Sequence, residues 1–425
     1  MLCLAAHGRP GDRPRFGAAM RILIVTHYWH PHRGGVETVA REQARRLVQR
    51  GHHVSVITSR LPGDPELVQD DGFPVYRVSA VNLLERLGIP YPLFSPGLVS
   101  LFERLMPVHD VVLIHGHSFM GSALGALMAR RHDRPAVLLQ HNPYIQYPFP
   151  WSIVERGADL LQGRYTVRSA TSVLAISEYT ARYVRALVPG RTIRVVRNGV
   201  STTRFSPVNS SDEQLAIRER LGLPSDCFIV FTVRRLVYRN GLDTLVAACA
   251  GLRKQRDLFV VIGGGGPERR SLERRIRREG LSNVRLIGPL PDELVPDFYR
   301  ASDAFVLPTR TGEGFGLAVL EAFASGLPVI ATRGGGQEEI VCEGRTGLLV
   351  PAASPGALAG AIVRLQSQPE LAYRMGRAGR ATALAMDWER CVDELEGILA
   401  EMTKGGSVPS AAHPRHDGSA RLAKI

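Results

Sequence analysis

Two glutamates separated by seven residues, Glu313 and Glu321, carry the most specific chemical signal in the chain. Glu313 lies in a polar loop, and Gly314-Phe315-Gly316 then leads into a helix that carries Glu321 about one and a half turns inside. The free N–H groups at this helix start favour an anion. A nucleotide diphosphosugar has a matching layout, with its diphosphate on the amides and its hydroxyls on the carboxylates. A helix-capping acid beside a surface glutamate explains the pattern almost as well.

Two glycine-rich turns are weaker signals. Gly34-Gly35 follows the apolar run 22–26 and precedes a helix, so its amides can approach an anion closely, although an ordinary tight turn is an equal explanation. Residues 263–267 (GGGGP) follow another apolar run but lack the Gly-Lys-Ser/Thr ending of a nucleotide-hydrolase loop. A structural turn is favoured there, with a role in lining a ligand cleft second.

Histidines at the predicted strand ends raise two further possibilities. A single histidine in such a place, such as His117, is commonly a structural residue. His27, His30 and His32 lie close together before Gly34 and invite a metal hypothesis, but no carboxylate or cysteine is expected to complete the ligand set. We therefore expect a polar loop there and no metal site.

The elements that must position these residues alternate between short apolar runs and helical patterns, which is typical of parallel strands buried on both faces. The candidate strands are 22–26, 54–58, 75–78, 111–115, 137–140, 173–176, 193–196, 229–233, 258–262, 284–287, 304–307 and 329–331. The fold class predicted is α/β, with two doubly wound, Rossmann-like domains facing across a cleft. Ligands in such sheets bind beyond the carboxyl ends of the strands, so two sheets that face each other would form one deep cleft between the domains.

Length and composition agree with two domains. The 425 residues suffice for two cores, and 44% of them are hydrophobic. The boundaries predicted are an extension at 1–19, an N-terminal domain at 20–200, a C-terminal domain at 201–386, a helix at 387–403 packing back on the first domain, and a disordered tail at 404–425. Met20 followed by an apolar run looks like a natural start.

Charge and cysteine content limit the function classes. The net charge of +13 is compatible with nucleic acid, an anionic lipid surface or a phosphorylated ligand. Nucleic-acid binding is not favoured, because no helix-turn-helix, metal-finger or stacked-aromatic signature is present. Five widely spaced cysteines fit a reducing cytosol, and no secretory signal or membrane-spanning run is found.

Over about residues 20–400 the sequence resembles family 4 of the retaining glycosyltransferases, which have the two-domain GT-B fold. The motifs that carry the resemblance occur in family order. They are Gly34-Gly35-Val36-Glu37, Ile114-His115-Gly116-His117, Ala175-Ile176-Ser177-Glu178, Arg197-Asn198-Gly199-Val200, Arg234-Arg235-Leu236, the 263–267 loop, Ala301-Ser302-Asp303, the pair Glu313 and Glu321, and Gly335-Gly336 followed by Glu339.

The resemblance implies a role for each matching residue. Glu313 would hold hydroxyls of the donor sugar, Glu321 the ribose and Arg235 the diphosphate, and His117 would lie near the donor sugar and the acceptor. The catalytic residues implied are Glu313, His117 and Arg235. The donor site implied consists of Gly34, Gly35, Arg235, Arg239, Asn240, Gly265, Leu290, Glu313, Phe315, Gly316, Leu317 and Glu321.

One position departs from the family. The family usually has a lysine five residues after the diphosphate arginine, where this chain has Asn240. Arg239 is the expected replacement for that charge, and a site with a single cation is the alternative. A pyridoxal-phosphate glycan phosphorylase, which shares the fold, is discounted because Lys254 is the only lysine in the folded region and lies in a charged turn.

The function implied is transfer of a hexosyl group, with retention, from a UDP- or GDP-sugar to a hydroxyl acceptor. A catalytically weak nucleotide-sugar-binding relative is the alternative. The acceptor expected is a lipid-linked or cell-envelope glycan, with the apolar stretch 83–106 as a candidate for acceptor or lipid contact and core packing as its equal alternative. The resemblance implies no cofactor and no metal. We expect a cytoplasmic protein, with contact to an anionic membrane surface at the inner face of the plasma membrane as a secondary expectation.

Overall fold

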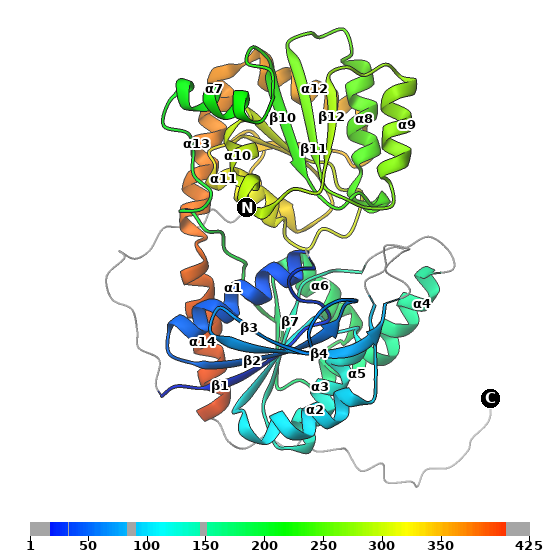
Figure 1. Ribbon diagram of the computed structural model, residues 1–425, viewed down its shortest axis with the longest axis vertical. Helices are drawn as coiled ribbons and strands as arrows, with labels where there is room; N and C mark the ends of the chain where they lie inside the picture. Colours follow the sequence, from blue (N-terminus) through cyan, green and yellow to red (C-terminus); the bar gives the residue numbers. More distant parts are fainter. Residues whose placement is uncertain (1–17, 33, 83–90, 145–150, 405–425) are drawn as a thin grey trace, which may run out of the picture.

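The computed structural model describes residues 18–32, 34–82, 91–144 and 151–404, and folds them into two α/β domains, one above the other in Figure 1. The predicted extension and tail fall almost wholly outside these residues, as does the start of the predicted acceptor stretch, 83–90. Each domain has one sheet with helices packed on it. The predicted fold class is therefore confirmed.

The first sheet follows the order β3-β4-β2-β1-β6-β7-β8-β9, and β5 pairs with β4. All pairs are parallel except those made by β3 and β5, which are antiparallel. The strands are β1 (Arg21–Val25), β2 (His53–Arg60), β3 (Leu67–Asp70), β4 (Phe73–Val81), β5 (Leu93–Phe94), β6 (Val111–His115), β7 (Ala136–Gln140), β8 (Ser172–Ala175) and β9 (Arg194–Val195). The sequence did not predict β3 and β5.

The second sheet follows the order β12-β11-β10-β13-β14-β15 and is parallel throughout. Its strands are β10 (Phe228–Val233), β11 (Leu258–Gly263), β12 (Val284–Gly288), β13 (Ala304–Leu307), β14 (Val329–Thr332) and β15 (Gly347–Val350). Here β15 is the strand that the sequence did not predict. The central strands β10 and β13 are buried almost along their whole length, which explains their continuous apolar sequences.

The helices cover both faces of the sheets. In chain order they are α1 (Gly35–Gln49), α2 (Gly97–Leu105), α3 (Met120–Arg131), α4 (Trp151–Ala158), α5 (Arg164–Ser169), α6 (Glu178–Leu187), α7 (Ser211–Arg220), α8 (Leu242–Gly251), α9 (Arg269–Arg278), α10 (Val295–Arg300), α11 (Leu317–Ala324), α12 (Pro355–Ser367), α13 (Pro369–Ala385) and α14 (Trp388–Lys404). Within the described ranges, none of them has both the length and the apolar composition needed to cross a bilayer.

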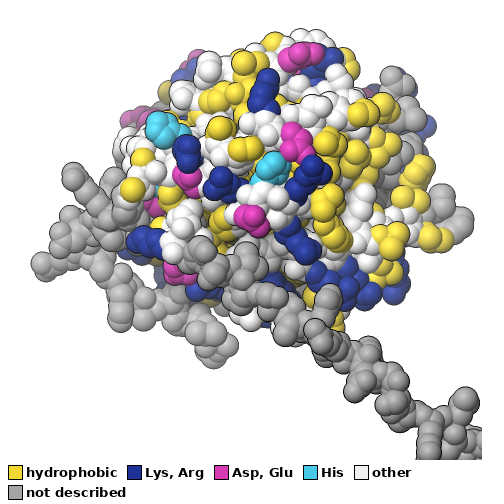
Figure 2. Space-filling model, turned by 90° about the horizontal axis from the view of Figure 1, so that it is seen from below, with side chains coloured by type: hydrophobic (Ala, Val, Ile, Leu, Met, Phe, Trp, Pro, Cys, Tyr) yellow, Lys and Arg dark blue, Asp and Glu magenta, His cyan; other side chains and the backbone are white. Residues whose placement is uncertain are grey.

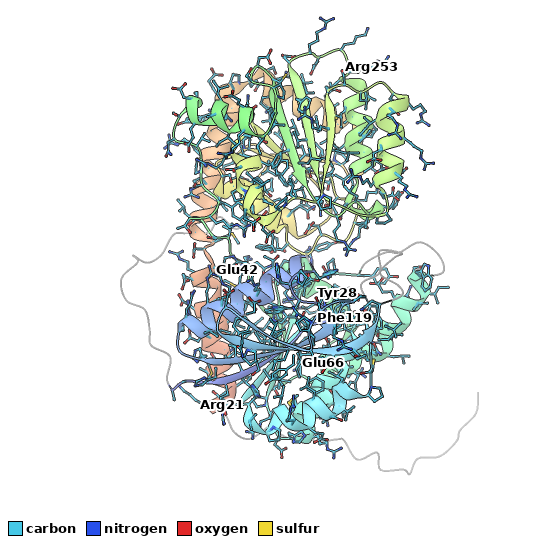
Figure 3. All side chains as sticks on the ribbon, in the orientation of Figure 1. Arg21, Tyr28, Glu42, Glu66, Phe119 and Arg253 are labelled. Carbon is cyan, nitrogen blue, oxygen red and sulfur yellow. The ribbon has the colours of Figure 1, made fainter. Side chains whose placement is uncertain are left out.

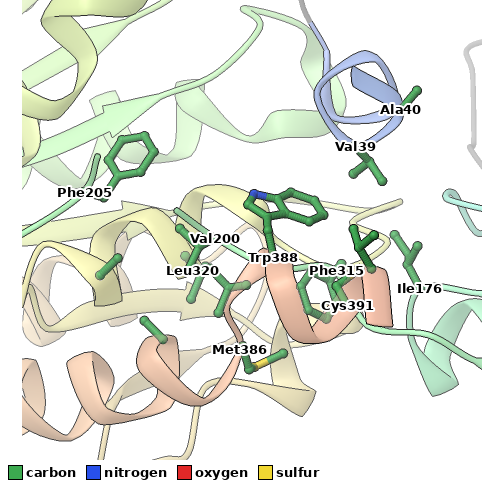
Figure 4. Packing of buried hydrophobic residues seen from close by; sticks show 14 of the residues in the cluster. Val39, Ala40, Ile176, Val200, Phe205, Phe315, Leu320, Met386, Trp388 and Cys391 are labelled. Carbon is green, nitrogen blue, oxygen red and sulfur yellow. The ribbon is translucent and has the colours of Figure 1, made fainter. Parts of the chain in front are cut away.

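The last helix ties the two domains together. After the second domain, α14 returns to the first and packs against α1. Arg50, directly after α1, donates to Glu396 at 2.7 Å, and His52 lies 3.1 Å from the same glutamate. Trp388, at the start of α14, is buried in a cluster that joins residues of both domains (Figure 4).

The two segments that connect the domains lie side by side. The Val200 N–H donates to the Met386 carbonyl at 3.0 Å. A Cβ atom at Gly199 would lie 2.5 Å from the Trp388 backbone, so only glycine permits this approach. The paired crossing and the packing of α14 therefore link the two domains.

Candidate active site

A cavity of about 600 Å³ lies between the domains, at the carboxyl ends of both sheets. Every residue of the donor site expected from sequence lines it. From the first domain these are Gly34 and Gly35, and from the second Arg235, Arg239, Asn240, Gly265, Leu290, Glu313, Phe315, Gly316, Leu317 and Glu321. Residues far apart in the chain thus meet at one place.

Glu313 is held by an arginine that sequence reasoning did not single out. A guanidinium nitrogen of Arg234 lies 2.5 Å from a Glu313 carboxylate oxygen, and the same guanidinium donates to the Thr309 hydroxyl. Burial lowers the pKa of Arg234, although the charge of Glu313 acts against this. The tandem arginines after β10 are the only sequence signal for this pair, and they do not show which of the two is bonded to Glu313.

The start of α11 faces across the cavity toward the first domain. Gly316 precedes the helix with φ of +95°, a left-handed conformation that glycine adopts without strain, and no side chain caps the helix. A Cβ atom at Gly35 would lie 3.8 Å from the Leu317 side chain, so the two predicted amide donors are on opposite walls of a narrow space. Unbonded N–H groups at a helix start suit a diphosphate.

Glu321 is half-buried, one turn further into α11. The Tyr299 hydroxyl donates to its carboxylate at 2.8 Å. Burial raises the pKa of Glu321 from 4.5 to about 7, against the lowering effect of this hydrogen bond. The side chain lines the cavity and is thus a ready acceptor for ligand hydroxyls.

The position that lacks the family lysine has a structural role. The Asn240 side-chain amide donates to the Arg235 carbonyl at 2.8 Å. Among the described residues, no hydrogen bond or ion pair holds the guanidinium groups of Arg235 and Arg239, and both residues line the cavity. Two cations are therefore available to an anionic ligand.

A second cavity of about 410 Å³ opens beside the first and shares with it His27, Val36, Asn142 and Arg239. His117 lines this second cavity and not the first. Apolar side chains form much of its wall, among them Phe119, Trp151 and Val154. Figure 3 shows Phe119 and Tyr28 at the edge of the first sheet that faces the second domain. Two ligands could therefore meet at the shared residues.

A carboxylate that the sequence did not point to lies beside the early histidines. Glu37 lies 2.8 Å from His32 and 3.8 Å from His27, because the first turn of α1 folds back over the preceding loop. Burial lowers the pKa of His27 to about 4, and that of His141 to about 3. No group of histidines, cysteines and carboxylates suited to a metal ion occurs among the residues that the structure describes.

Direct contacts close the two domains on each other. The Ser177 hydroxyl donates to the Gly314 carbonyl at 2.6 Å. The Glu339 carboxylate accepts from the N–H groups of Glu178 and Tyr179, at the start of α6, at 3.1 and 2.7 Å. Two motifs with no role expected from sequence thus join the domains beside the cavity.

The molecule has two α/β domains, each with a mainly parallel sheet whose carboxyl edge faces a common cavity. This arrangement defines a GT-B glycosyltransferase fold. Solved structures agree. A sucrose-phosphate synthase from Thermosynechococcus elongatus superposes with a TM-score of 0.77 at 24% identity, covering 91% of this chain and 100% of that one. HepE from Anabaena, solved in complex with UDP, gives a TM-score of 0.74 at 21% identity, with 90% and 100% covered.

Sequence relatives give the family. A model described as Glycosyltransferase Family 4 matches residues 33–204, and one described as Glycosyl transferases group 1 matches residues 213–382. A GDP-mannose-dependent alpha-(1-6)-phosphatidylinositol monomannoside mannosyltransferase from Mycolicibacterium smegmatis is 32% identical, with 85% of this chain and 94% of the relative covered. A D-inositol 3-phosphate glycosyltransferase from Geodermatophilus obscurus is 31% identical, with 97% and 91% covered. The chain belongs to glycosyltransferase family 4.

Proposed function

We propose that this glycosyltransferase moves a hexosyl group, with retention and without a metal ion, from a nucleotide diphosphosugar to a hydroxyl of a lipid-linked or cell-envelope glycan. The observation that carries the proposal is the common cavity. It places Glu313, the unbonded start of α11 and two unpaired arginines of the described chain around one space between the domains.

The site chemistry supports departure of a nucleoside diphosphate. Negative charge builds on the diphosphate as its bond to the sugar breaks. Arg235 and the amides near Gly316 stabilise that charge in the cavity between the domains. The departing phosphate can take the proton of the acceptor hydroxyl on the same face, so that no strong protein base and no metal ion is needed.

GDP-mannose is the first donor to test, because the Mycolicibacterium smegmatis relative is described as GDP-mannose-dependent. The acceptor of that relative is a phosphatidylinositol monomannoside, which has a hydroxylated head and an apolar tail. The second cavity suits such a molecule, because its wall combines His117 and Asn142 with apolar side chains. Contact with a membrane surface follows as part of the proposal.

A nucleotide-sugar binder with weak catalysis is the second candidate, favoured by one observation. Asn240 carries no charge and uses its amide on the Arg235 carbonyl. If the lysine found in the family is essential for turnover, binding would remain while transfer is lost.

A panel of GDP-, UDP- and ADP-sugars tests the proposal on the purified protein. We expect one donor to raise the melting temperature and to be turned over with octyl α-mannoside, and Glu313→Ala to abolish turnover. Methyl α-mannoside, which has the same head without the tail, should be the poorer acceptor. Binding without turnover for every donor would favour the second candidate, and no binding would refute both.

A further inference from the structure

Three side chains from separate segments meet on the wall of the second cavity. His117 follows β6, Asp159 opens a π-helical turn (Asp159–Gly163) directly after α4, and Tyr183 lies on α6. His117 Nε2 lies 3.0 Å from Asp159 Oδ1, and the Tyr183 hydroxyl donates to Asp159 Oδ2. Both carboxylate oxygens are therefore engaged.

The burial of these side chains indicates which groups donate and which accept. Asp159 is 4% exposed and His117 is 3% exposed. A buried carboxylate can only accept hydrogen bonds, and it is costly unless donors surround it. Burial and the charge of Asp159 raise the pKa of Tyr183, so its hydroxyl stays protonated and keeps donating. Asp159 therefore favours a proton on the facing nitrogen of His117.

The opposite nitrogen of the ring is then an acceptor. With a neutral ring protonated at Nε2, Nδ1 carries a lone pair. Within the described residues, both ring nitrogens of His117 are buried and neither makes a hydrogen bond of standard geometry; Nε2 has the 3.0 Å contact with Asp159, whereas Nδ1 has no polar partner. An unsatisfied buried acceptor is unfavourable, and a ligand hydroxyl that donates to it would offset this cost.

We propose that Asp159 is a positioning residue, which holds His117 protonated at Nε2 so that Nδ1 accepts a hydrogen bond from a hydroxyl of the acceptor next to the reacting one. The acceptor is then a polyol with an apolar substituent, because two hydroxyls and the apolar wall are both used. This inference rests on the proposed function. The reacting hydroxyl keeps its own proton for the departing phosphate.

A glycine in the same turn explains how the contact fits. A Cβ atom at Gly163 would lie 2.6 Å from the His117 ring. Gly163 has helical φ and ψ of −62° and −48°, so alanine is compatible with its backbone and would act only by pushing the ring. Gly360, on α12 in the second domain, has nothing within 4 Å of the corresponding position and lines neither cavity.

The tautomer of His117 can be measured without any substrate. In ¹⁵N-histidine-labelled protein, with the signal assigned by its loss in His117→Gln, we expect the Nε2–H form. Asp159→Asn should shift the population toward the Nδ1–H form, while Asp110→Asn, an ion-paired carboxylate at the amino edge of the same sheet, should not. A wild-type ring protonated at Nδ1, or no response to Asp159→Asn, would overturn the proposal.

Kinetics test the positioning role through the acceptor. With GDP-mannose and octyl α-mannoside, Asp159→Asn should lower kcat/KM for the acceptor roughly tenfold and leave GDP affinity unchanged. Among monodeoxy analogues of octyl α-mannoside, the one that lacks the hydroxyl bonded to Nδ1 should have a kcat/KM about tenfold lower than octyl α-mannoside for the wild type. For Asp159→Asn, the kcat/KM values of these two acceptors should be equal. Uniform losses with every deoxy analogue would contradict the assignment.

The glycine pair supplies a matched steric test. Gly163→Ala should reduce transfer to octyl α-mannoside while Gly360→Ala leaves it unchanged, with GDP affinity equal in both. Equal activity of the two variants would count against a fixed His117 ring. If the wild type turns over no nucleotide sugar, the proposed function fails, and the tautomer measurement still decides whether Asp159 controls His117.

Discussion

Arg234 and Glu313 form an ion pair of 2.5 Å on the wall of the interdomain cavity, with both side chains largely buried. The pair fixes the carboxylate that we assign to the donor sugar. It also keeps the positive charge of Arg234 next to the space that a diphosphosugar would fill. Arg235 and Arg239, which line the same cavity, then remain available for the diphosphate.

Removing Arg234 should therefore lower both the stability of the protein and its activity. Arg234→Met leaves Glu313 buried and unpaired, and breaking such a pair costs about 3–5 kcal/mol. We expect a lower free energy of unfolding and a loss of donor turnover. The double variant Arg234→Met/Glu313→Gln should recover much of the stability without activity. Arg194→Met, which breaks the exposed pair with Glu401, is the control and should cost at most about 1 kcal/mol.

The diphosphate arginine and its missing lysine give a second prediction. Arg235→Ala should abolish most transfer and keep the fold, because no hydrogen bond or ion pair within the described residues depends on its guanidinium. Asn240→Lys should be tolerated and should tighten GDP binding in calorimetry, since an ammonium can still donate to the Arg235 carbonyl. A collapse of donor binding in Asn240→Lys would mean that this position does not face the diphosphate.

Glu321 predicts a pH dependence of stability. Its pKa is raised from 4.5 to about 7, so between these values the folded protein binds a proton that the unfolded chain has lost. Stability from this group is thus full below pH 4.5, falls as pH rises toward 7, and is constant above. Glu321→Gln, which keeps an acceptor for Tyr299, should flatten that part of the unfolding curve.

Nucleotide binding should follow the opposite trend. Ribose hydroxyls donate best to the ionised carboxylate, so GDP affinity should rise with pH up to about 7 in the wild type and not in Glu321→Gln. Calorimetry in buffers of different ionisation enthalpy should also show proton release on binding at pH 6. An affinity that is independent of pH in both proteins would remove Glu321 from the ribose site.

Local sequence predicted the buried strands well because both faces of a parallel strand are apolar. It did not predict β3, which is a short antiparallel edge strand with exposed and half-buried residues in alternation. The strand β15 was also missed, because its sequence, Gly-Leu-Leu-Val, has a glycine and a single β-branched residue and so lacks the composition typical of a strand. The predicted first helix corresponds to α1, and the predicted last helix to α14.

The site was predictable where a motif carries the chemistry, as for Glu313 and Glu321. It was not predictable where tertiary packing chooses the partner. Sequence does not show that Arg234 rather than Arg235 is bonded to Glu313, since neighbouring residues on a loop can point either way. Asp159 has no local signal at all, because its histidine lies more than forty positions earlier in the chain.

An exposed apolar surface flanks the second cavity and gives a prediction for membrane contact. Leu161 is 77% exposed and Ile153 is 63% exposed, and Leu161 also lines the cavity. Figure 2, viewed from below the first domain, shows apolar and basic side chains interspersed on the face turned toward the viewer. Leu161→Asp should weaken co-sedimentation with phosphatidylglycerol vesicles several-fold. Leu384→Asp, at an exposed leucine of α13 in the second domain, should not.

Glu339 predicts how the cavity is kept closed. Its carboxylate belongs to the second domain and accepts two backbone hydrogen bonds at the start of α6 in the first, where the helix dipole favours a negative charge. The Ser177 hydroxyl bonds to Gly314, next to Glu313, so closure and the donor site share one contact region. Glu339→Ala should therefore shift the domains toward a more open arrangement about the paired crossing at Val200 and Met386.

The expected result is a larger radius of gyration by small-angle scattering and a GDP affinity reduced by about tenfold, because ligand binding must then supply the free energy of closure. Glu343→Ala is the matched control, since the Glu343 carboxylate also accepts a backbone N–H, that of Leu349, but within the second domain. If Glu339→Ala and Glu343→Ala leave the radius of gyration and the GDP affinity equally unchanged, the contact at α6 does not govern closure, and the packing of α14 alone must hold the domains together.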